Sequence, residues 1–253
     1  MMLSLPILYI FLYLLGILTS RPKIGGGSLM TDSSQAFQNI EKPGVLFNKS
    51  PIPFKKNRTL QIIIVVLVIL WGLTAIRPAD WTFYLLENIP VLLFILLLAF
   101  LYKRIWLSNF SYLSISLLVI LNAYGAHYDY TNTPIDGWIR NLFGVKGEYY
   151  DQIVHFSFGL LMAFPLKEFL TRFIKLRTFW LYLFIFSLLM AMSATFEITE
   201  MLVNIITNPH NPEKHMRLEH DPFNTHKDMT MVLVGSLISI IIMIVTGGRR
   251  KGK

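Results

Sequence analysis

Long runs of apolar residues, separated by shorter polar segments, dominate the pattern along this chain. A helix needs about 20 mostly apolar residues to cross the hydrocarbon core of a bilayer. Six runs have roughly that length, at residues 60–76, 81–101, 110–126, 151–170, 179–206 and 229–246. The pattern therefore predicts an all-α integral membrane protein with a six-span helical bundle. A further apolar stretch at residues 3–19 would add a seventh, N-terminal span.

Composition supports the membrane class, since only 15% of the residues are charged and 54% are hydrophobic. A soluble domain carries about 25% charged residues.

We expect four parts along the chain. Residues 1–29 are an anchor, an extra span or a stretch upstream of a true start at Met30. Residues 30–58 are a polar, disordered cytoplasmic lead-in, residues 59–248 the membrane core and residues 249–253 a basic cytoplasmic tail.

The distribution of charge predicts the orientation. The formal net charge is +8, and 17 of the 23 Lys and Arg residues lie before the first span or on every second loop after it. Basic residues accumulate on cytoplasmic loops. Both ends of the six-span core are therefore expected in the cytoplasm of a bacterial cell, as in a multi-pass inner (plasma) membrane protein. Because the basic residues are spread over separate loops, no nucleic-acid partner is expected, and the bilayer is the expected partner.

Acidic and histidine residues gather at the opposite ends of the spans. Asp151 and His155 are spaced i, i+4 and share a helix face, as do Glu197 and Glu200 at i, i+3. The candidate catalytic residues are Glu197, Glu200, His155, Asp151 and Asp228. The candidates for contacting a substrate or surrounding the site are His127, Tyr128, Tyr130, Asp221 and His226.

This set of side chains suits two kinds of chemistry. His155, Glu197, Glu200 and Asp228 are candidate ligands of a divalent metal, and oxygen and nitrogen ligands fit Zn, Mn or Fe. The same residues equally suit an acid/base pair. The chain contains no cysteine, so a thiolate metal site is excluded.

A simpler interpretation remains open for each acid. Asp151 and Asp228 fall at expected helix N-termini, where a carboxylate caps free N–H groups. Glu197 and Glu200 fall about 20 residues into their span, where they would reach the headgroup region at small cost.

Several short motifs, taken in order, resemble those of a known family. They are LEN at 86–88, SNFSY at 108–112, GAHYDY at 125–130, YDQIVHF at 150–156, FEITE at 196–200 and DPFNTHKDM at 221–229. On these residues the chain resembles the YjdF-like bacterial inner-membrane proteins, a domain of unknown function, over residues 60–248. A more distant similarity links it to the VanZ-like membrane proteins, which are tied to glycopeptide resistance.

The resemblance implies a fold and a site position but no activity. It also carries departures, since the family often has His at Asn122, an acid at Asn224 and Gln at His226. If Asn122 and Asn224 replace family ligands, this chain binds a metal differently or not at all.

The sequence is compatible with three functions. The first is a metal-dependent or acid/base hydrolase or transferase that acts at the outer leaflet on a lipid-linked or envelope substrate. The second is a small-solute or proton-linked transporter, although transporters usually place their polar residues near the midplane. The third is a structural or accessory subunit whose polar residues hold helix ends together.

Overall fold

The computed structural model describes residues 46–48, 51–102, 104–105, 107–130, 133–145, 147–207 and 223–249. The elements in these ranges are all helical: η1 (Phe54–Lys56), α3 (Arg58–Thr74), α4 (Trp81–Leu101), α5 (Asn109–His127), α6 (Pro134–Phe143), α7 (Tyr150–Phe173), α8 (Thr178–Thr207) and α9 (Asn224–Arg249). The expected N-terminal span at 3–19, Asp221 and the end of the basic tail lie outside the described residues.

Five of these helices, α4, α5, α7, α8 and α9, are long and apolar enough to cross a membrane. They coincide with five of the six predicted runs, which confirms a helical integral membrane protein. The sixth run forms α3, an apolar helix of 17 residues. That length is the lower limit of the range that spans a bilayer, about 17–25 residues.

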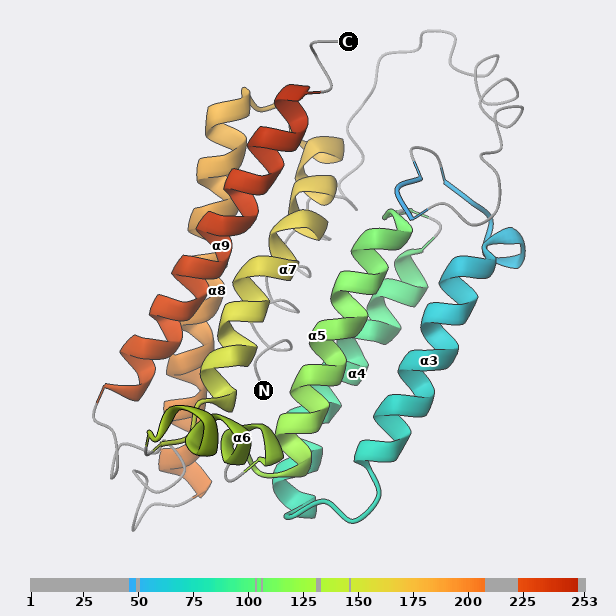
Figure 1. Ribbon diagram of the computed structural model, residues 1–253. Coiled ribbons are helices and arrows are strands. Elements are labelled where there is room, and N and C mark those ends of the chain that lie inside the picture. The colour runs from blue at the N-terminus through green and yellow to red at the C-terminus, as the bar shows by residue number, and fades with distance from the viewer. Residues whose placement is uncertain are drawn as a thin grey trace, which may run out of the picture.

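The helices form two groups of three that run side by side (Figure 1). In the first group α5 packs against both α3 and α4, and in the second α7 packs against both α8 and α9. Contacts between α5 and α7 join the groups, and the α7–α9 contact is the most extensive in the bundle. We call the end of the bundle that carries α6 the α6 end, and the opposite end the η1 end.

Polar side chains cap the helices where the apolar runs begin. The Asp80 carboxylate accepts hydrogen bonds from the Thr82 and Phe83 N–H groups at the start of α4, at 2.6 and 3.1 Å. Ser108 caps α5 and Asn57 caps α3 in the same way. These bonds satisfy amides that no helical carbonyl can reach, so each helix starts at a defined residue.

The outward faces of the long helices carry large apolar side chains such as Ile62, Phe100 and Ile241. In water such a surface would be unfavourable, whereas in a bilayer it meets lipid chains. Val91, Val119 and Leu189 face the interior and are fully buried. The pattern of exposure is therefore that of a bundle surrounded by lipid.

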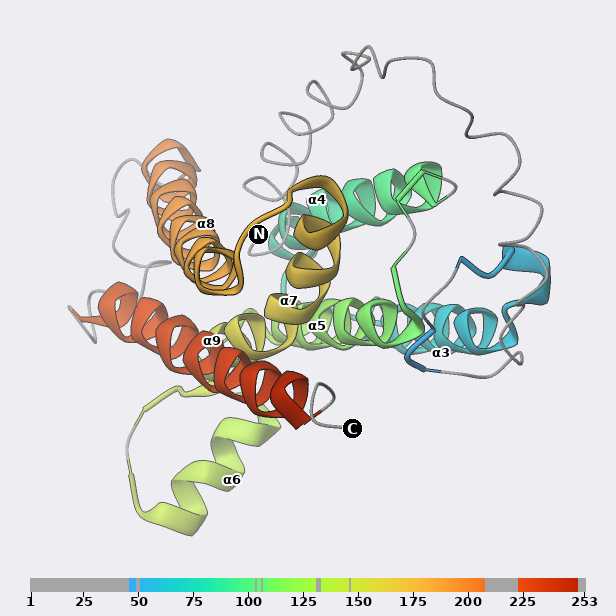
Figure 2. The ribbon, with the colours of Figure 1, turned by 90° about the horizontal axis from the view of Figure 1, so that it is seen from above.

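Helix α6 was not predicted from the apolar runs, because its ten residues are too few to form one. It follows α5 at this end of the bundle, and seen from above it extends away from the other helices, beyond α9 (Figure 2). Thr133 and Asp136 form a reciprocal capping box at its start, and Gly144 ends it with a positive φ of 64°. Trp138, Leu142 and Phe143 are exposed on its surface.

The last part of the expected disordered lead-in packs against the η1 end. The Leu46 carbonyl accepts a hydrogen bond from Phe110 N–H at 2.8 Å, and the Asn48 side chain accepts one from Asn109 N–H at 2.8 Å. The Phe47 and Phe110 rings stack with centroids 4.7 Å apart. The stretch is polar overall, but its apolar residues, such as Phe47, pack against the bundle.

Candidate functional site

The first two turns of α7 carry two polar residues that point into the bundle. Asp151 and His155 lie on one face of this helix, and the imidazole Nε2 of His155 is 3.7 Å from Oδ1 of Asp151. The His155 side chain is fully buried and Asp151 is nearly so. The i, i+4 spacing in the sequence thus gives a buried pair, as predicted from the helical period.

Helix α8 adds a third residue to this pair. Oε1 of Glu197 is 3.5 Å from Nε2 of His155, and the Glu197 side chain is buried. The ring of the preceding residue, Phe196, packs edge-on against the imidazole at a centroid distance of 5.5 Å. Apolar packing on one side and carboxylates on the other therefore surround His155.

Helix α9 supplies the fourth residue. Asp228 is 1% exposed, and one ligand atom from each of Asp151, His155 and Asp228 lies within 4.8 Å of the other two. Nδ2 of Asn224, one turn earlier on α9, donates a hydrogen bond of 2.8 Å to Oδ2 of Asp228. We call Asp151, His155, Glu197 and Asp228 the carboxylate–histidine cluster.

Two distances in this cluster, from His155 to Asp151 and to Glu197, resemble those between ligands of one metal ion. Charge-assisted hydrogen bonds are about 2.7–2.9 Å long, whereas the two contacts of His155 measure 3.5 and 3.7 Å. Ligand atoms about 2.1 Å from a common tetrahedral centre lie about 3.4 Å apart. Three carboxylates around one imidazole also concentrate negative charge in a buried place, which a divalent cation would offset.

The capping interpretation does not account for Asp228, and at the start of α7, where Asp151 lies in the first turn, another acid accepts the free N–H groups. The N–H groups of Tyr149 and Tyr150 at the start of α7 donate to Oδ1 of Asp136 on α6, at 2.6 and 2.9 Å. Asp136 therefore caps the helix on which Asp151 lies. A cap acts on the N–H groups of the first turn of a helix. Because α9 begins at Asn224, Asp228 is its fifth residue and lies beyond that turn.

A close crossing of α7 and α9 holds the cluster together. Gly159 on α7 faces the backbone of Val232 and Ser236 on α9, and Gly235 on α9 faces the backbone of Phe156 and Leu160 on α7. Small residues let membrane helices approach closely. His155 lies one turn from this crossing on α7. The close packing of the two helices therefore brings Asp228 of α9 near Asp151 and His155.

The other predicted site residues lie elsewhere. Glu200 is half-buried one turn nearer the end of α8, and His226 is exposed with its ring 6.2 Å from that of Phe223. Nδ1 of His127 is 2.8 Å from the Thr74 carbonyl oxygen at the end of α3, and the His127 ring packs against Tyr128. These described contacts place His127 and Tyr128 at the α3–α5 junction.

Tyr130 is buried beside α5 and not in the carboxylate–histidine cluster. Its hydroxyl donates to Oδ1 of Asn122 at 3.0 Å, and its ring covers Gly125. Asn122 is the position at which the resemblance described above implied a His in the family. In this chain the side-chain oxygen of Asn122 accepts the Tyr130 hydroxyl.

Two residues with clear roles were not among the sequence candidates. Asn224 orients Asp228, and the i, i+4 spacing of these two residues on a helix was the available signal. Asp136 links α6 to α7, and the Thr133-x-x-Asp136 pattern resembles a capping box. The start of α9 was placed five residues too late, at 229, and this hid the helical register of Asn224.

Comparison with known proteins places the chain in a family. A family model described as "Predicted membrane protein (DUF2238)" matches residues 59–249. The chain is also 25% identical over 186 residues to "Inner membrane protein YjdF" of Escherichia coli (strain K12), covering 73% of this chain and 87% of that protein. No solved structure matches the chain. Together with the apolar helices, these matches identify a multi-pass inner-membrane protein, and the chain belongs to the DUF2238 family of predicted membrane proteins.

Proposed function

We propose that the carboxylate–histidine cluster binds a divalent metal ion and that the protein is a metal-dependent hydrolase or transferase. The observation that carries this proposal is the position of Asp151, His155 and Asp228, whose ligand atoms approach within 4.8 Å of one another in a buried place. Two helices far apart in sequence supply these atoms. A ligand set of one imidazole and carboxylates suits Zn, Mn or Fe.

The four residues divide into ligands and a proton acceptor. His155 Nε2 and the carboxylates of Asp151 and Asp228 are the ligands, and Asn224 orients the Asp228 carboxylate by a hydrogen bond. Glu197 reaches the same imidazole nitrogen from α8, so its carboxylate would serve as a fourth ligand or as a general base beside the metal. When bound, a divalent metal would supply Lewis-acid activation of water near neutral pH.

The orientation of the chain sets where this chemistry takes place. Most of the Lys and Arg residues that the structure describes lie toward the η1 end, and such residues favour the cytoplasmic side. The α6 end and its cluster then face outward, with both ends of the core in the cytoplasm. A lipid-linked or envelope substrate would approach from the outer leaflet. His226 and Glu200 lie within one helical turn of Asp228 and Glu197, respectively, so they would be near such a substrate.

The experiment is metal analysis of the full chain purified in detergent, by elemental mass spectrometry. We expect about one metal ion per chain in the wild type and a loss of most of it in Glu197→Gln and Asp151→Asn. Glu148→Gln is the matched control, because this carboxylate lies just before α7 and outside the cluster. Each variant is checked for folding by its elution in size-exclusion chromatography and its thermal unfolding.

The outcomes separate the competing functions. Metal that is lost only in the cluster variants supports the proposal and justifies a screen of lipid-phosphate and other envelope substrates. Absence of metal from a wild-type protein purified without chelators and reloaded with Zn, Mn and Fe would contradict it. Acid/base chemistry, transport or a structural role would then be the explanation of the buried acids.

A further inference from the structure

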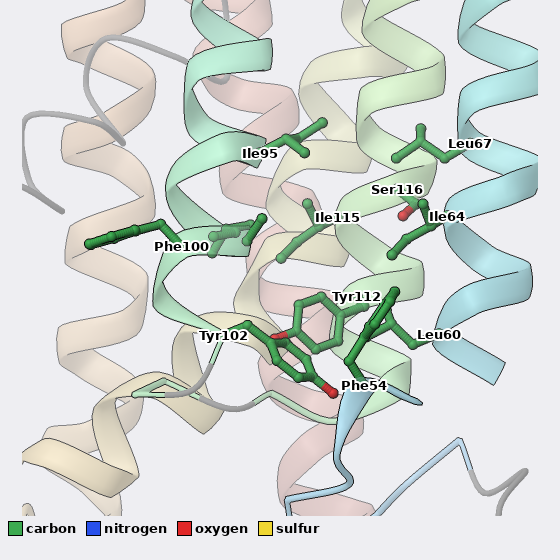
Figure 3. Close-up of a pocket in the computed structure, with 12 residues that line it drawn as sticks. Phe54, Leu60, Ile64, Leu67, Ile95, Phe100, Tyr102, Tyr112, Ile115 and Ser116 are labelled. Carbon is green, nitrogen blue, oxygen red and sulfur yellow. The ribbon is translucent and has the colours of Figure 1, made fainter. Parts of the chain in front are cut away.

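A second feature lies at the η1 end, far from the carboxylate–histidine cluster. It is an apolar groove of about 620 Å³ between α3 and α4, with α5 behind it (Figure 3). Leu60 and Ile64 come from α3, Ile95 and Leu98 from α4, and Ile115 from α5. A volume of this size is within the range of ligand pockets, about 300–1,000 Å³.

The groove exists because α3 and α4 both pack against α5 and not closely against each other at this end. Phe54 of η1 closes the end of the groove and packs edge-on against Tyr102, with ring centroids 6.1 Å apart. The Tyr102 hydroxyl donates to the Ile52 carbonyl oxygen at 2.7 Å. Burial raises the pKa of Tyr102 above its usual value, so this donor stays protonated.

The side of the groove faces lipid. Its walls belong to helices that form the membrane bundle, and the lining residues Ile64 and Phe100 are exposed. An open apolar groove at this position has the acyl chains of surrounding lipids as its nearest occupants. An acyl chain also matches the apolar lining chemically.

Basic residues lie within two positions of the lining residues Phe54, Leu60 and Tyr102 at the η1 end of the groove. Lys55 and Lys56 belong to η1, Arg58 begins α3 and Arg104 follows α4, and all four are exposed. Neither residues 46–58 nor residues 101–112 contain an acid. Glu168 approaches this region from α7, where its carboxylate accepts hydrogen bonds from Ser108 N–H and the Ser111 hydroxyl and pairs with Arg172.

We infer that this groove binds one anionic phospholipid, with an acyl chain against α5 and the phosphate beside Lys55, Lys56, Arg58 and Arg104. Basic pockets between membrane helices on the cytoplasmic side are suited to anionic headgroups. The inference is independent of the proposed metal site, since the two lie at opposite ends of the bundle. The ligand is a lipid of the leaflet that the η1 end faces.

The acyl-chain part is tested by filling the groove. Ala99 lines it and is exposed, so Ala99→Trp blocks the groove without disturbing the interior. Ala191→Trp is the matched control, because Ala191 is an exposed alanine on α8. In native mass spectrometry of the full chain with phosphatidylglycerol, we expect one retained lipid in the wild type and in Ala191→Trp. Ala99→Trp should retain at least tenfold less.

The headgroup part is tested by removing charge at the mouth. We expect Lys55→Gln/Lys56→Gln to lower phosphatidylglycerol retention by about tenfold, with no change in Lys175→Gln/Arg177→Gln, which removes two exposed charges elsewhere on the same side. Phosphatidylethanolamine should bind the wild type more weakly than phosphatidylglycerol. Equal retention of the two lipids, equal retention by the two tryptophan variants, or no retained lipid in the wild type would each overturn the inference.

Discussion

Gly159 of α7 and Gly235 of α9 lie backbone to backbone, each within van der Waals contact of the opposite helix. A methyl group added to Gly159 would come 2.8 Å from Ser236 N, and one added to Gly235 would come 2.9 Å from Leu160 N, with backbone carbonyl oxygens closer still. Neither position has room for a side chain. This crossing sets the separation of the helices that carry His155 and Asp228.

Gly159→Ala should therefore force α7 and α9 apart. We expect a loss of stability of about 1–3 kcal/mol, typical of overpacking, and weaker metal binding because Asp228 moves away from His155. Thermal unfolding in detergent and metal content measure the two effects. Gly72→Ala is the control, since no atom lies within 4 Å of a methyl group there. Unfolding of Gly159→Ala at the wild-type temperature would show that the crossing is looser than described.

Asn224→Ala removes the amide that donates to Asp228. Partners that orient metal ligands typically contribute 10–100-fold to metal affinity, and we expect a reduction in that range. Competition with a fluorescent chelator measures the affinity of the purified variant. Asn141→Ala, an exposed asparagine on α6, is the control. An unchanged affinity in Asn224→Ala would indicate that Asp228 needs no orienting partner.

Asp136→Ala removes the acceptor that joins α6 to the start of α7. The carboxylate accepts hydrogen bonds from Thr133, Tyr149 and Tyr150, so its loss leaves several donors without this partner. We expect a destabilisation of about 1–3 kcal/mol. Hydrogen exchange should show faster exchange of the first turn of α7 and little change in α9. Equal acceleration in both helices would instead point to global unfolding.

The exposed apolar residues of α6 should lie in the headgroup region. Trp138, Leu142 and Phe143 share this short helix with Arg140, and the helix extends to one side of the bundle (Figure 2). A helix with apolar and polar sides is suited to the membrane interface. The chain has no cysteine, so a spin label on Leu142→Cys is unique. In nanodiscs we expect oxygen to reach it better than a water-soluble nickel complex does.

The label on Asn141→Cys is the control for that measurement, because it replaces an exposed polar residue of the same helix. We expect the nickel complex to reach it readily. Equal access of the nickel complex to both labels would place α6 in water, above the membrane surface.

The sequence alone determined the class of the protein and much of its local structure. Crossing a bilayer requires a long apolar helix, so the positions of five spans followed from composition along the chain. The pairing of Asp151 with His155 also followed, because it depends only on the helical period within α7. The uneven distribution of Lys and Arg predicted that both ends of the core are cytoplasmic, and the proposed function assumes this orientation.

Only the tertiary structure decided which of these residues meet. The sequence placed Glu197 and Glu200 on one face, and the rotation of α8 against α7 brings Glu197 to His155. Asp228 joins Asp151 and His155 because α7 and α9 cross where Gly159 and Gly235 let their backbones approach. Helix rotation, crossing point and the groove between α3 and α4 depend on packing between distant segments, which no local pattern of apolar residues contains.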